Sequence, residues 1–339
     1  MNCRTRKSTL MRLLNACCAA AVSLSALASV SCAADHGEAI TDASKSGPDF
    51  QVQGEYVGDV KIGDKTVKYG AQIIALGDGA FDAVVYTGGL PGDGWQRGDD
   101  RKKVGGKTVD GVTTFVGDKW TAKLADGKIA VTGSGGESLG TLTKTERKSP
   151  TLGEKPPAGA QILFDGTNAD QFKNGKMTED NLLQVGVVSK PTFEDFKLHL
   201  EFRTPFMPKA RGQGRGNSGV YLQNRYEVQV LDSFGLEGLD NECGGIYKQT
   251  SPKVNMCLPP LAWQTYDIDF TAARWEAGKK TKNARVTIKH NGVTIYDDLE
   301  LTGATPGGVG EGPEKTGFQL QNHGNPVNYR NIWVVEKKS

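Results

Sequence analysis

Short stretches in which apolar and polar residues alternate, separated by glycine-rich turns, recur along most of the chain. In residues 197–203, Leu198, Leu200 and Phe202 alternate with polar and charged residues. Successive side chains of a β-strand point to opposite faces of the sheet, so this pattern predicts a strand with one buried face. Asp-Gly pairs, such as residues 126–127, stand between such stretches and are typical of β-hairpins. The pattern predicts an all-β protein.

The strand pattern falls into two blocks, and a length of 339 residues also favours two domains. Between the blocks, residues 144–160 mix charges with three prolines and show no periodicity, which is typical of a linker. We therefore expect a flexible arm at 35–49, a small antiparallel β domain of unknown role at 50–143, a linker at 144–160 and a second β domain at 161–338.

The N-terminus has the pattern of a secretory signal. Residues 1–12 are basic, residues 13–30 are mostly apolar or small, and small residues precede Asp35. Two alternatives are a retained membrane anchor, although serines and Asn15 dilute the apolar run, and lipid attachment at Cys32. We expect cleavage after residue 34, no membrane span in the mature chain, and a secreted or periplasmic location.

The balance of charge argues against nucleic acid as a partner. The chain has 41 basic and 39 acidic residues, a net charge of +2, and four of the basic residues lie in the expected signal, which has no acid. The mature chain is therefore slightly acidic, at 2 − 4 = −2. It lacks the basic surface of a nucleic-acid-binding protein.

Two cysteines, Cys243 and Cys257, remain outside the expected signal and its edge. In an oxidising compartment they form a disulfide or stay as buried free thiols, and spacing alone leaves both alternatives open. Neither belongs to a Cys-x-x-Cys pair or lies near a spaced pair of histidines, which excludes the usual zinc sites.

Polar residues on four strands of the second block are expected to form one face of a sheet. Glutamine and tyrosine are frequent among them and lysine is nearly absent, which favours a sugar-binding face over a merely solvated one, because amides and aromatic rings bind sugar hydroxyls and C–H faces. The sequence has no Gly-x-Ser-x-Gly or His-Glu-x-x-His motif, and the glycine-rich residues 212–216 precede a strand rather than a helix, which fits a loop at the rim of this face. The expected face comprises Glu201, Arg203, Tyr221, Gln223, Glu227, Gln229, Gln319 and Gln321, with His323 just beyond it.

Six motifs of the second block, in order, resemble the 3-keto-disaccharide hydrolase domain family, which is common in secreted bacterial proteins. They lie at residues 162–166, 216–222, 226–232, 245–247, 263–267 and 319–333. The resemblance implies a concanavalin A-like β-sandwich (jelly roll) that hydrolyses glycosides already oxidised to a ketone at C3. The basic, glycine-rich residues 208–216 and the two cysteines depart from the family pattern.

A ketone at C3 makes the hydrogen on C2 acidic, so that elimination of the group on C1 followed by addition of water becomes an alternative to two-carboxylate hydrolysis. Glu227 is the candidate base, Arg203 or a metal the candidate group at the enolate oxygen, and His323 the candidate acid. Glu201, Tyr221, Gln223, Gln229, Tyr247, Gln319 and Gln321 are the candidate substrate-binding residues.

Each of these assignments has a structural alternative. Glu227 and Arg203 could form a salt bridge, His323 could cap a turn, and Asp232 is either a metal ligand or a turn residue. The sequence leaves a requirement for a divalent metal open. A lectin-like module that binds carbohydrate without chemistry is the alternative function.

Overall fold

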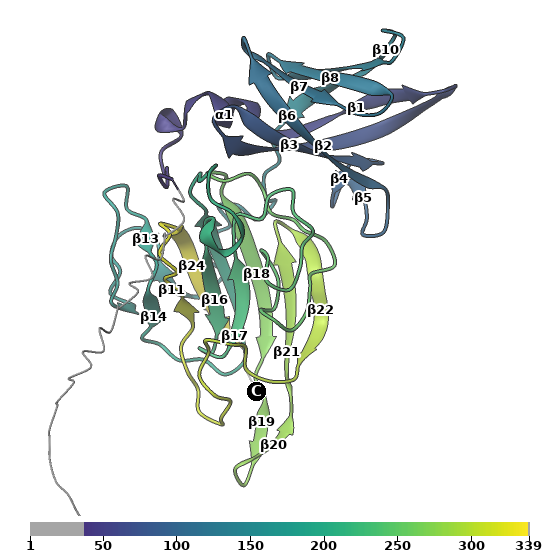
Figure 1. The fold of residues 1–339 in the computed structure, drawn as a ribbon. Coiled ribbons are helices and arrows are strands. Elements are labelled where there is room, and N and C mark those ends of the chain that lie inside the picture. Colours follow the sequence, from purple (N-terminus) through teal and green to yellow (C-terminus); the bar gives the residue numbers. More distant parts are fainter. Residues whose placement is uncertain (1–36, 338–339) are drawn as a thin grey trace, which may run out of the picture. The chain divides into compact units, whose positions relative to one another are not determined.

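The structure is a computed structural model that describes residues 37–337. The expected signal sequence, its cleavage site and Cys32 lie outside these residues. Within the described range, no helix has the length and apolar character needed to cross a bilayer. The described residues are almost entirely β-structure, as the alternating pattern predicts (Figure 1).

The first β region closes into a barrel of eight strands, in the order β1-β2-β3-β6-β7-β8-β9-β10, with β10 paired back to β1. Each strand pairs antiparallel with its neighbours along the chain, apart from the short insertion of β4 and β5 between β3 and β6. The strands are β1 (Gly54–Ile62), β2 (Lys65–Gly77), β3 (Ala80–Thr87), β4 (Leu90–Pro91), β5 (Gly94–Trp95), β6 (Arg101–Val109), β7 (Val112–Val116), β8 (Trp120–Ala125), β9 (Lys128–Gly133) and β10 (Ser138–Thr145).

The residues expected to form an arm contain two short helices, η1 (Ala43–Lys45) and α1 (Gly47–Val52). Ile40 forms a β-bridge with Phe206, and the ring of Phe50 packs against Phe206 with 5.3 Å between centroids. Phe206 is a buried member of the barrel's apolar core. This stretch is therefore anchored by apolar contacts at one end of the barrel.

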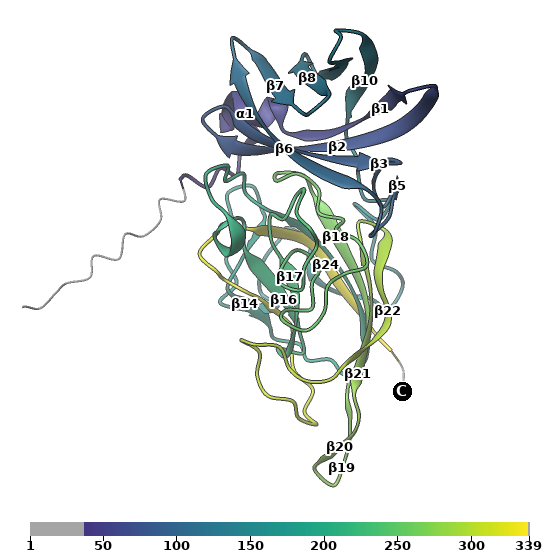
Figure 2. The same cartoon turned by 45° about the vertical axis from the view of Figure 1, so that its right-hand side comes forward.

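The second β region is a sandwich of two antiparallel sheets (Figures 1 and 2). The seven-stranded sheet contains β11 (Gln161–Phe164), β24 (Asn328–Glu336), β15 (Phe196–Arg203), β18 (Gln264–Thr271), β21 (Ala284–His290), β22 (Val293–Leu301) and, paired with β24, β13 (Leu183–Gln184). The five-stranded sheet contains β12 (Phe172–Lys173), β14 (Val187–Ser189), β23 (Gln319–Leu320), β16 (Ser218–Leu222) and β17 (Tyr226–Val230). A hairpin of β19 (Arg274–Glu276) and β20 (Lys279–Lys282) and the short helix η2 (Gly212–Gly214) complete the region.

The core between the two sheets matches the expected alternation. The residues predicted to face it are at most 2% exposed, namely Leu198, Leu200, Phe202, Val228, Val230, Phe318 and Leu320. All belong to one apolar cluster. The predicted register of β15 and β17 is therefore confirmed, and so is the fold class, a small β domain followed by a β-sandwich.

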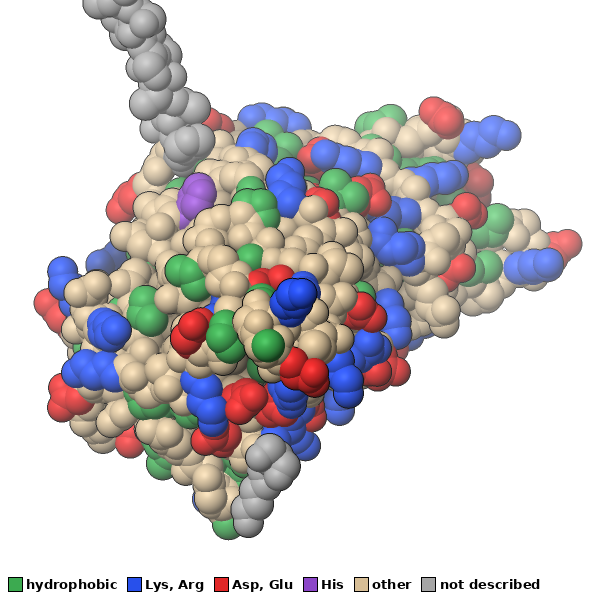
Figure 3. Space-filling model, turned by 90° about the horizontal axis from the view of Figure 1, so that it is seen from below, with side chains coloured by type: hydrophobic (Ala, Val, Ile, Leu, Met, Phe, Trp, Pro, Cys, Tyr) green, Lys and Arg blue, Asp and Glu red, His purple; other side chains and the backbone are tan. Residues whose placement is uncertain are grey.

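Charged side chains of both signs are mixed on the face of the molecule shown in Figure 3. Lys and Arg alternate there with Asp and Glu rather than gathering in a single patch. This surface agrees with the near-neutral net charge of the sequence.

Candidate functional site

The most informative polar group lies on the outer face of the five-stranded sheet, where Tyr221 and Glu227 are directly opposite each other in the β16–β17 pair. Gln223 and Asn224 both have positive φ, 49° and 58°, and turn the chain tightly between the two strands. Because Val228 and Val230 point into the core, Glu227 and Gln229 must point to the opposite face. The hydroxyl of Tyr221 donates a hydrogen bond of 2.7 Å to Oε2 of Glu227.

Glu227 is 2% exposed, and within the described part of the chain no basic side chain forms an ion pair with it. Burial raises the pKa of its carboxyl to about 7, and the hydrogen bond from Tyr221 opposes this rise. A Cβ on Gly219 would lie 2.2 Å from Oε1 of Glu227, so glycine is needed there to make room for the carboxylate. A carboxylate with a pKa near neutrality and no cationic partner is suited to taking up a proton.

Two acceptor atoms near this carboxylate lack donors. Nε2 of Gln321 donates to the Tyr221 hydroxyl at 3.1 Å, while Oε1 of Gln321 is buried and unpaired. Oε1 of Glu227 accepts no hydrogen bond from the described residues, because Tyr221 bonds to Oε2, but unlike Oε1 of Gln321 it is not a fully buried atom. Unpaired buried acceptors are costly, and hydroxyl groups of a ligand are the donors that would satisfy them.

The remaining expected residues of this face surround the pair. Gln319 is opposite Tyr221 in the β16–β23 register, and its amide makes no hydrogen bond to another described side chain or backbone group. Nε2 of Gln229 donates to Oε1 of Gln213 at 3.0 Å. The half-buried Tyr247 follows along the neighbouring segment, where its backbone N–H donates to the Glu227 carbonyl at 3.1 Å. The structure thus brings together Tyr221, Glu227, Gln229, Tyr247, Gln319 and Gln321.

Two contributors to this site come from loops and are not among the residues predicted from the sequence. Oγ1 of Thr305 accepts a hydrogen bond from the backbone N–H of Glu227 at 2.9 Å, and the Pro306 carbonyl lies 3.2 Å from the Tyr221 hydroxyl. They belong to residues 302–316, which have no helix or strand and hence no periodic pattern to reveal them. Gln213 comes from the glycine-rich loop expected at the rim, a position that its contact with Gln229 supports.

The expectation that Glu201 and Arg203 share this face is wrong. Both lie on β15, which belongs to the seven-stranded sheet, whereas β16, β17 and β23 belong to the five-stranded sheet. Side chains that point away from the core on opposite sheets of a sandwich face opposite sides of the domain. A salt bridge between Arg203 and Glu227 is therefore excluded, and Arg203 cannot hold the enolate oxygen of a substrate bound at Glu227.

Arg203 instead stacks on Trp263, with 5.0 Å between its guanidinium and the ring centroid, and Arg330 stacks on the same ring at 4.0 Å. Burial and the neighbouring Arg330 lower the pKa of Arg203. Both cations stack on one indole ring, so Arg203 is a packing residue on the outer face of the seven-stranded sheet.

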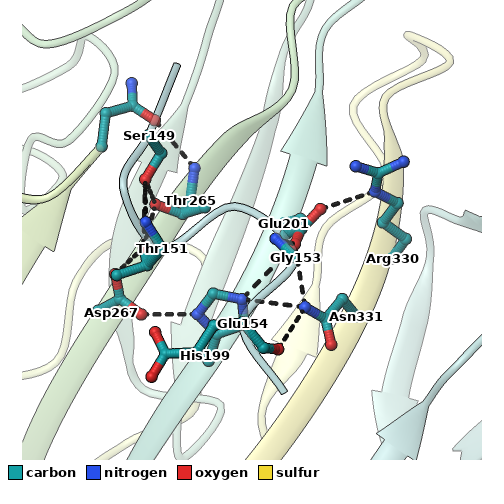
Figure 4. A network of polar contacts seen from close by, with 11 residues as sticks. Ser149, Thr151, Gly153, Glu154, His199, Glu201, Thr265, Asp267, Arg330 and Asn331 are labelled. Atoms are coloured by element: carbon teal, nitrogen blue, oxygen red, sulfur yellow. Dashed lines mark hydrogen bonds and ion pairs between the residues drawn. The ribbon is translucent and has the colours of Figure 1, made fainter. Parts of the chain in front are cut away.

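Glu201 lies in a dense polar network on the outer face of the seven-stranded sheet (Figure 4). It accepts hydrogen bonds from Arg330 Nε at 2.6 Å, the Gly153 backbone N–H at 2.6 Å and Asn331 Nδ2 at 2.9 Å. Burial opposes the charged form, but these donors and His199 outweigh it and lower the pKa of Glu201 to about 2. Glu201 is therefore charged at neutral pH. Through its hydrogen bond with Gly153 it attaches residues 149–154, the middle of the expected linker, to the sheet.

The cluster in this network with the spacing of a metal site is Glu154, His199 and Asp267, whose ligand atoms lie within 4.8 Å of one another (Figure 4). Nδ1 of His199, however, is 2.6 Å from Oδ1 of Asp267. Despite burial, the hydrogen bonds to Asp267 and Glu201 raise the pKa of His199 to about 9. In the metal-free protein at neutral pH, His199 and Asp267 therefore form an ion pair.

Three further predicted residues have other surroundings. The side chain of Gln223 turns away from the face and donates to the Phe193 carbonyl at 2.9 Å. Asp232 forms a buried ion pair with Arg215 at 2.6 Å. His323 is exposed in the turn after β23, where the side chain of Asn322, rather than His323, accepts the hydrogen bond from Gly324 N–H.

Cys243 and Cys257 are both free and buried, so of the two alternatives that the sequence leaves open, the structure has free thiols and no disulfide between them. Sγ of Cys243 lies 3.3 Å from the Tyr266 hydroxyl, and Sγ of Cys257 lies 3.4 Å from the Leu231 carbonyl. They are packing residues of the sandwich core.

Among the solved structures that this chain resembles are two proteins from Parabacteroides distasonis ATCC 8503, each provisionally named a glycosyl hydrolase. One is 32% identical over 53% of this chain and 85% of its own, with a TM-score of 0.49. The other is 16% identical over 53% of this chain and 94% of its own, with a TM-score of 0.39. No curated protein matches the chain in sequence.

Comparison with protein families matches a 3-keto-alpha-glucoside-1,2-lyase-like domain to residues 159–335. The match covers just over half of the 339-residue chain and spans both sheets of the sandwich, including β16 and β17. It agrees with the resemblance found from the sequence motifs. The chain therefore belongs to the family of proteins that carry a 3-keto-alpha-glucoside-1,2-lyase-like domain.

Proposed function

We propose that this protein is a carbohydrate-active enzyme that cleaves glycosides carrying a ketone at C3, with Glu227 as the base that removes the proton from C2. The observation that carries the proposal is the buried Glu227 carboxyl, whose pKa is raised to about 7 and whose Oε1 lacks a donor. It lies beside the unpaired acceptor of Gln321. Membership of the 3-keto-alpha-glucoside-1,2-lyase-like family supports the class of substrate.

The proposed reaction balances as an elimination followed by an addition. Glu227 takes the proton from C2, the electron pair of that bond forms a double bond between C1 and C2, and the bond between C1 and the leaving oxygen breaks. The leaving oxygen keeps its electron pair and receives a proton from the general acid, which regains a proton from the water that adds in the second stage. Water then adds across the double bond, with its hydroxyl on C1 and a hydrogen returned to C2 by the protonated Glu227, so that the net reaction is hydrolysis.

The C3 oxygen and the leaving oxygen need donors as charge develops on them. Because Arg203 lies on the other sheet, we assign the C3 oxygen to the amide of Gln319, which is opposite Tyr221 in register and uncommitted. His323 is the proposed acid at the leaving oxygen on the sequence prediction alone, because it is exposed beyond β23 and no hydrogen bond or ion pair links it to Tyr221 or Glu227. Tyr221, Gln229, Tyr247 and Gln321 would bind the sugar hydroxyls and ring.

Access to Glu227 requires movement of the loop segment that covers it. Thr305 and Pro306 contact Glu227 and Tyr221, and a Cβ on Gly307 would lie 2.7 Å from the Tyr221 hydroxyl. The proposal therefore includes outward displacement of residues 305–307 on substrate binding.

The test is to incubate the protein with a 3-keto-disaccharide and with its unoxidised parent, and to measure release of monosaccharide. The wild type should cleave only the oxidised sugar, and Glu227→Gln should lose about 10²–10⁴-fold in rate, as is typical when a general base is removed. Equal cleavage of the parent sugar would rule out dependence on the C3 ketone.

The chain offers a matched control in Glu311, which also accepts a hydrogen bond from a tyrosine, with Tyr226 OH at 2.6 Å from its Oε1. Glu311→Gln should keep wild-type turnover, because Glu311 also pairs with Lys280 and is not on the β16–β17 face. Full activity of Glu227→Gln would overturn the assignment. Binding of both sugars without release would favour the lectin-like alternative.

A further inference from the structure

The eight-stranded barrel contributes no residue to the proposed cleavage reaction. An eight-stranded barrel has an interior that is either filled by side chains or wide enough for one small ligand. Inward-facing side chains fill one end, where Tyr56, Ala75, Phe81 and Leu124 are buried together with Phe206. The other end contains a cavity of about 300 Å³.

Small inward-facing residues create this cavity. Ala71 on β2, Ala83 on β3 and Ala122 on β8 line it, and each leaves space that a larger apolar side chain would fill. Larger inward residues around it, such as Tyr69 and Val85, remain partly exposed although they point into the barrel. Partial exposure of inward-facing residues shows that the interior is open to solvent at this end.

The open end can be located from the strands. Ile62 ends β1, Thr87 ends β3 and Trp120 begins β8, and all three line the cavity. The opposite end is closed, because Asp49 of α1 accepts a hydrogen bond of 3.1 Å from the Gly79 N–H in the β2–β3 turn. Ile62 is 52% exposed at the rim.

The lining indicates the chemistry of a ligand. Nearly all of it is apolar, and the charged residues are Asp100 and Lys102, which are exposed near the start of β6 and opposite in sign. A cavity without a buried charge gives no favourable partner to an ionised group, and burying such a group unpaired is costly. The lining therefore favours an uncharged molecule.

We propose that the barrel binds an uncharged, predominantly apolar small molecule inside this cavity. The volume of about 300 Å³ lies at the lower end of the range of small-molecule pockets. The ligand enters past Ile62 and Trp120 and buries its apolar body against Ala71, Ala83 and Ala122. This site is separate from Glu227 and does not depend on the proposed cleavage reaction.

The test uses the neutral fluorescent probe N-phenyl-1-naphthylamine and the full mature chain. The probe should bind with increased fluorescence at a stoichiometry of one, and Ala122→Leu should weaken binding at least about tenfold, because the added side chain fills the cavity. Ala130→Leu is the matched control, since Ala130 is on the neighbouring β9, exposed on the outside of the barrel, and directly beside the register partner of Ala122.

Ala83→Leu, on β3, provides a second cavity-filling variant in case Ala122→Leu fails to fold, with circular dichroism as the check on folding. Wild-type affinity in a folded cavity-filling variant would overturn the proposal. So would an equal loss of binding in Ala130→Leu, because the probe would then be responding to the outer surface.

Discussion

The hydroxyl of Tyr221 donates a 2.7 Å hydrogen bond to the Glu227 carboxylate across the β16–β17 pair. Burial raises the pKa of both groups, that of Glu227 to about 7 and that of Tyr221 well above its usual range. The hydrogen bond stabilises the charged carboxylate and so opposes the effect of burial on Glu227. The pKa of Glu227 therefore depends on the hydrogen bond from Tyr221 as well as on burial.

Tyr221→Phe should raise the pKa of Glu227 further, because it removes the donor that favours the carboxylate. A general base acts when deprotonated, so kcat/KM on a 3-keto-glucoside should rise with pH through about 7 in the wild type and at higher pH in the variant. A pH–rate profile of both proteins measures this shift. An acidic limb at the same or lower pH in Tyr221→Phe would contradict the relationship.

Glu227→Gln should stabilise the protein above neutral pH even though it lowers turnover about 10²–10⁴-fold. The folded-state pKa of about 7 exceeds the ordinary value of 4.5, so between these values the folded state binds more protons than the unfolded state. Stability from the wild-type group is therefore lost as pH rises from 4.5 through about 7. At pH 8 the amide variant should be more stable by about 1–3 kcal/mol, and at pH 4.5 by almost nothing.

Urea unfolding at pH 4.5 and pH 8 tests this difference. Glu311→Gln serves again as the control, because its partner Lys280 stabilises the charged form and no such gain is expected. A loss of stability in Glu227→Gln at pH 8 would show that the buried carboxylate has a partner that the structure lacks.

The outward direction of Glu227 and the inward direction of Val228 could be predicted from the sequence, because the period of two along a strand is a local property. The sheet to which a strand belongs is not local. β15 and β17 have the same alternation, but β15 pairs with β18 and β24 while β17 pairs with β16. The sequence pattern therefore placed Arg203 beside Glu227, although they lie on opposite sheets.

The apolar–polar alternation of strands also does not predict which loop residues contact the site. Thr305 accepts a hydrogen bond from the Glu227 backbone N–H and lies in an irregular segment. The alternation extends the strand to Gln223, but the positive φ of Gln223 places it in the turn. The spacing of Asp232 could not reveal its partner Arg215, which lies 17 residues earlier and comes close only in the folded chain. The motif resemblance, in contrast, identified the family from residues on several strands.

Cys243 and Cys257 should both react with an alkylating reagent in denaturant without prior reduction, because both are free thiols in the core. Peptide mapping by mass spectrometry would find one label on each cysteine. Unlabelled residues that become labelled only after reduction would indicate a disulfide, whose removal typically costs about 2–5 kcal/mol.

Arg203→Met should leave cleavage of the 3-keto-disaccharide within about twofold of the wild type, because Arg203 stacks on Trp263 on the sheet opposite to Glu227. Loss of the stacked cation should cost about 0.5–1 kcal/mol of stability, partly offset by relief of its repulsion from Arg330. Steady-state kinetics and thermal unfolding measure both effects. A loss of turnover of 10²-fold or more would restore Arg203 to the catalytic site.

Glu201→Gln should have an effect on stability opposite to that of Glu227→Gln, although both remove a buried carboxylate from an outer sheet face. The pKa of Glu201 is lowered to about 2 from an ordinary 4.5, so its contribution is complete above pH 4.5 and is lost as pH falls through about 2. The variant leaves Arg330 without its partner and weakens the attachment of residues 149–154. At pH 7 it should lose about 1–3 kcal/mol, because Glu201 is buried and hydrogen-bonded while Arg330 is 38% exposed and keeps access to water, with turnover per folded molecule unchanged.

His199 also makes the stability of this network depend on pH in the alkaline range. Its pKa of about 9 lies above the ordinary 6.5, so the stability that it contributes is complete below pH 6.5 and is lost as pH rises through about 9. Chemical unfolding of the wild type and Glu201→Gln between pH 3 and pH 10 should therefore show the largest difference between them near neutrality. A constant difference across this range would mean that Glu201 acts through packing alone, since neither titration would then contribute to the free energy of unfolding.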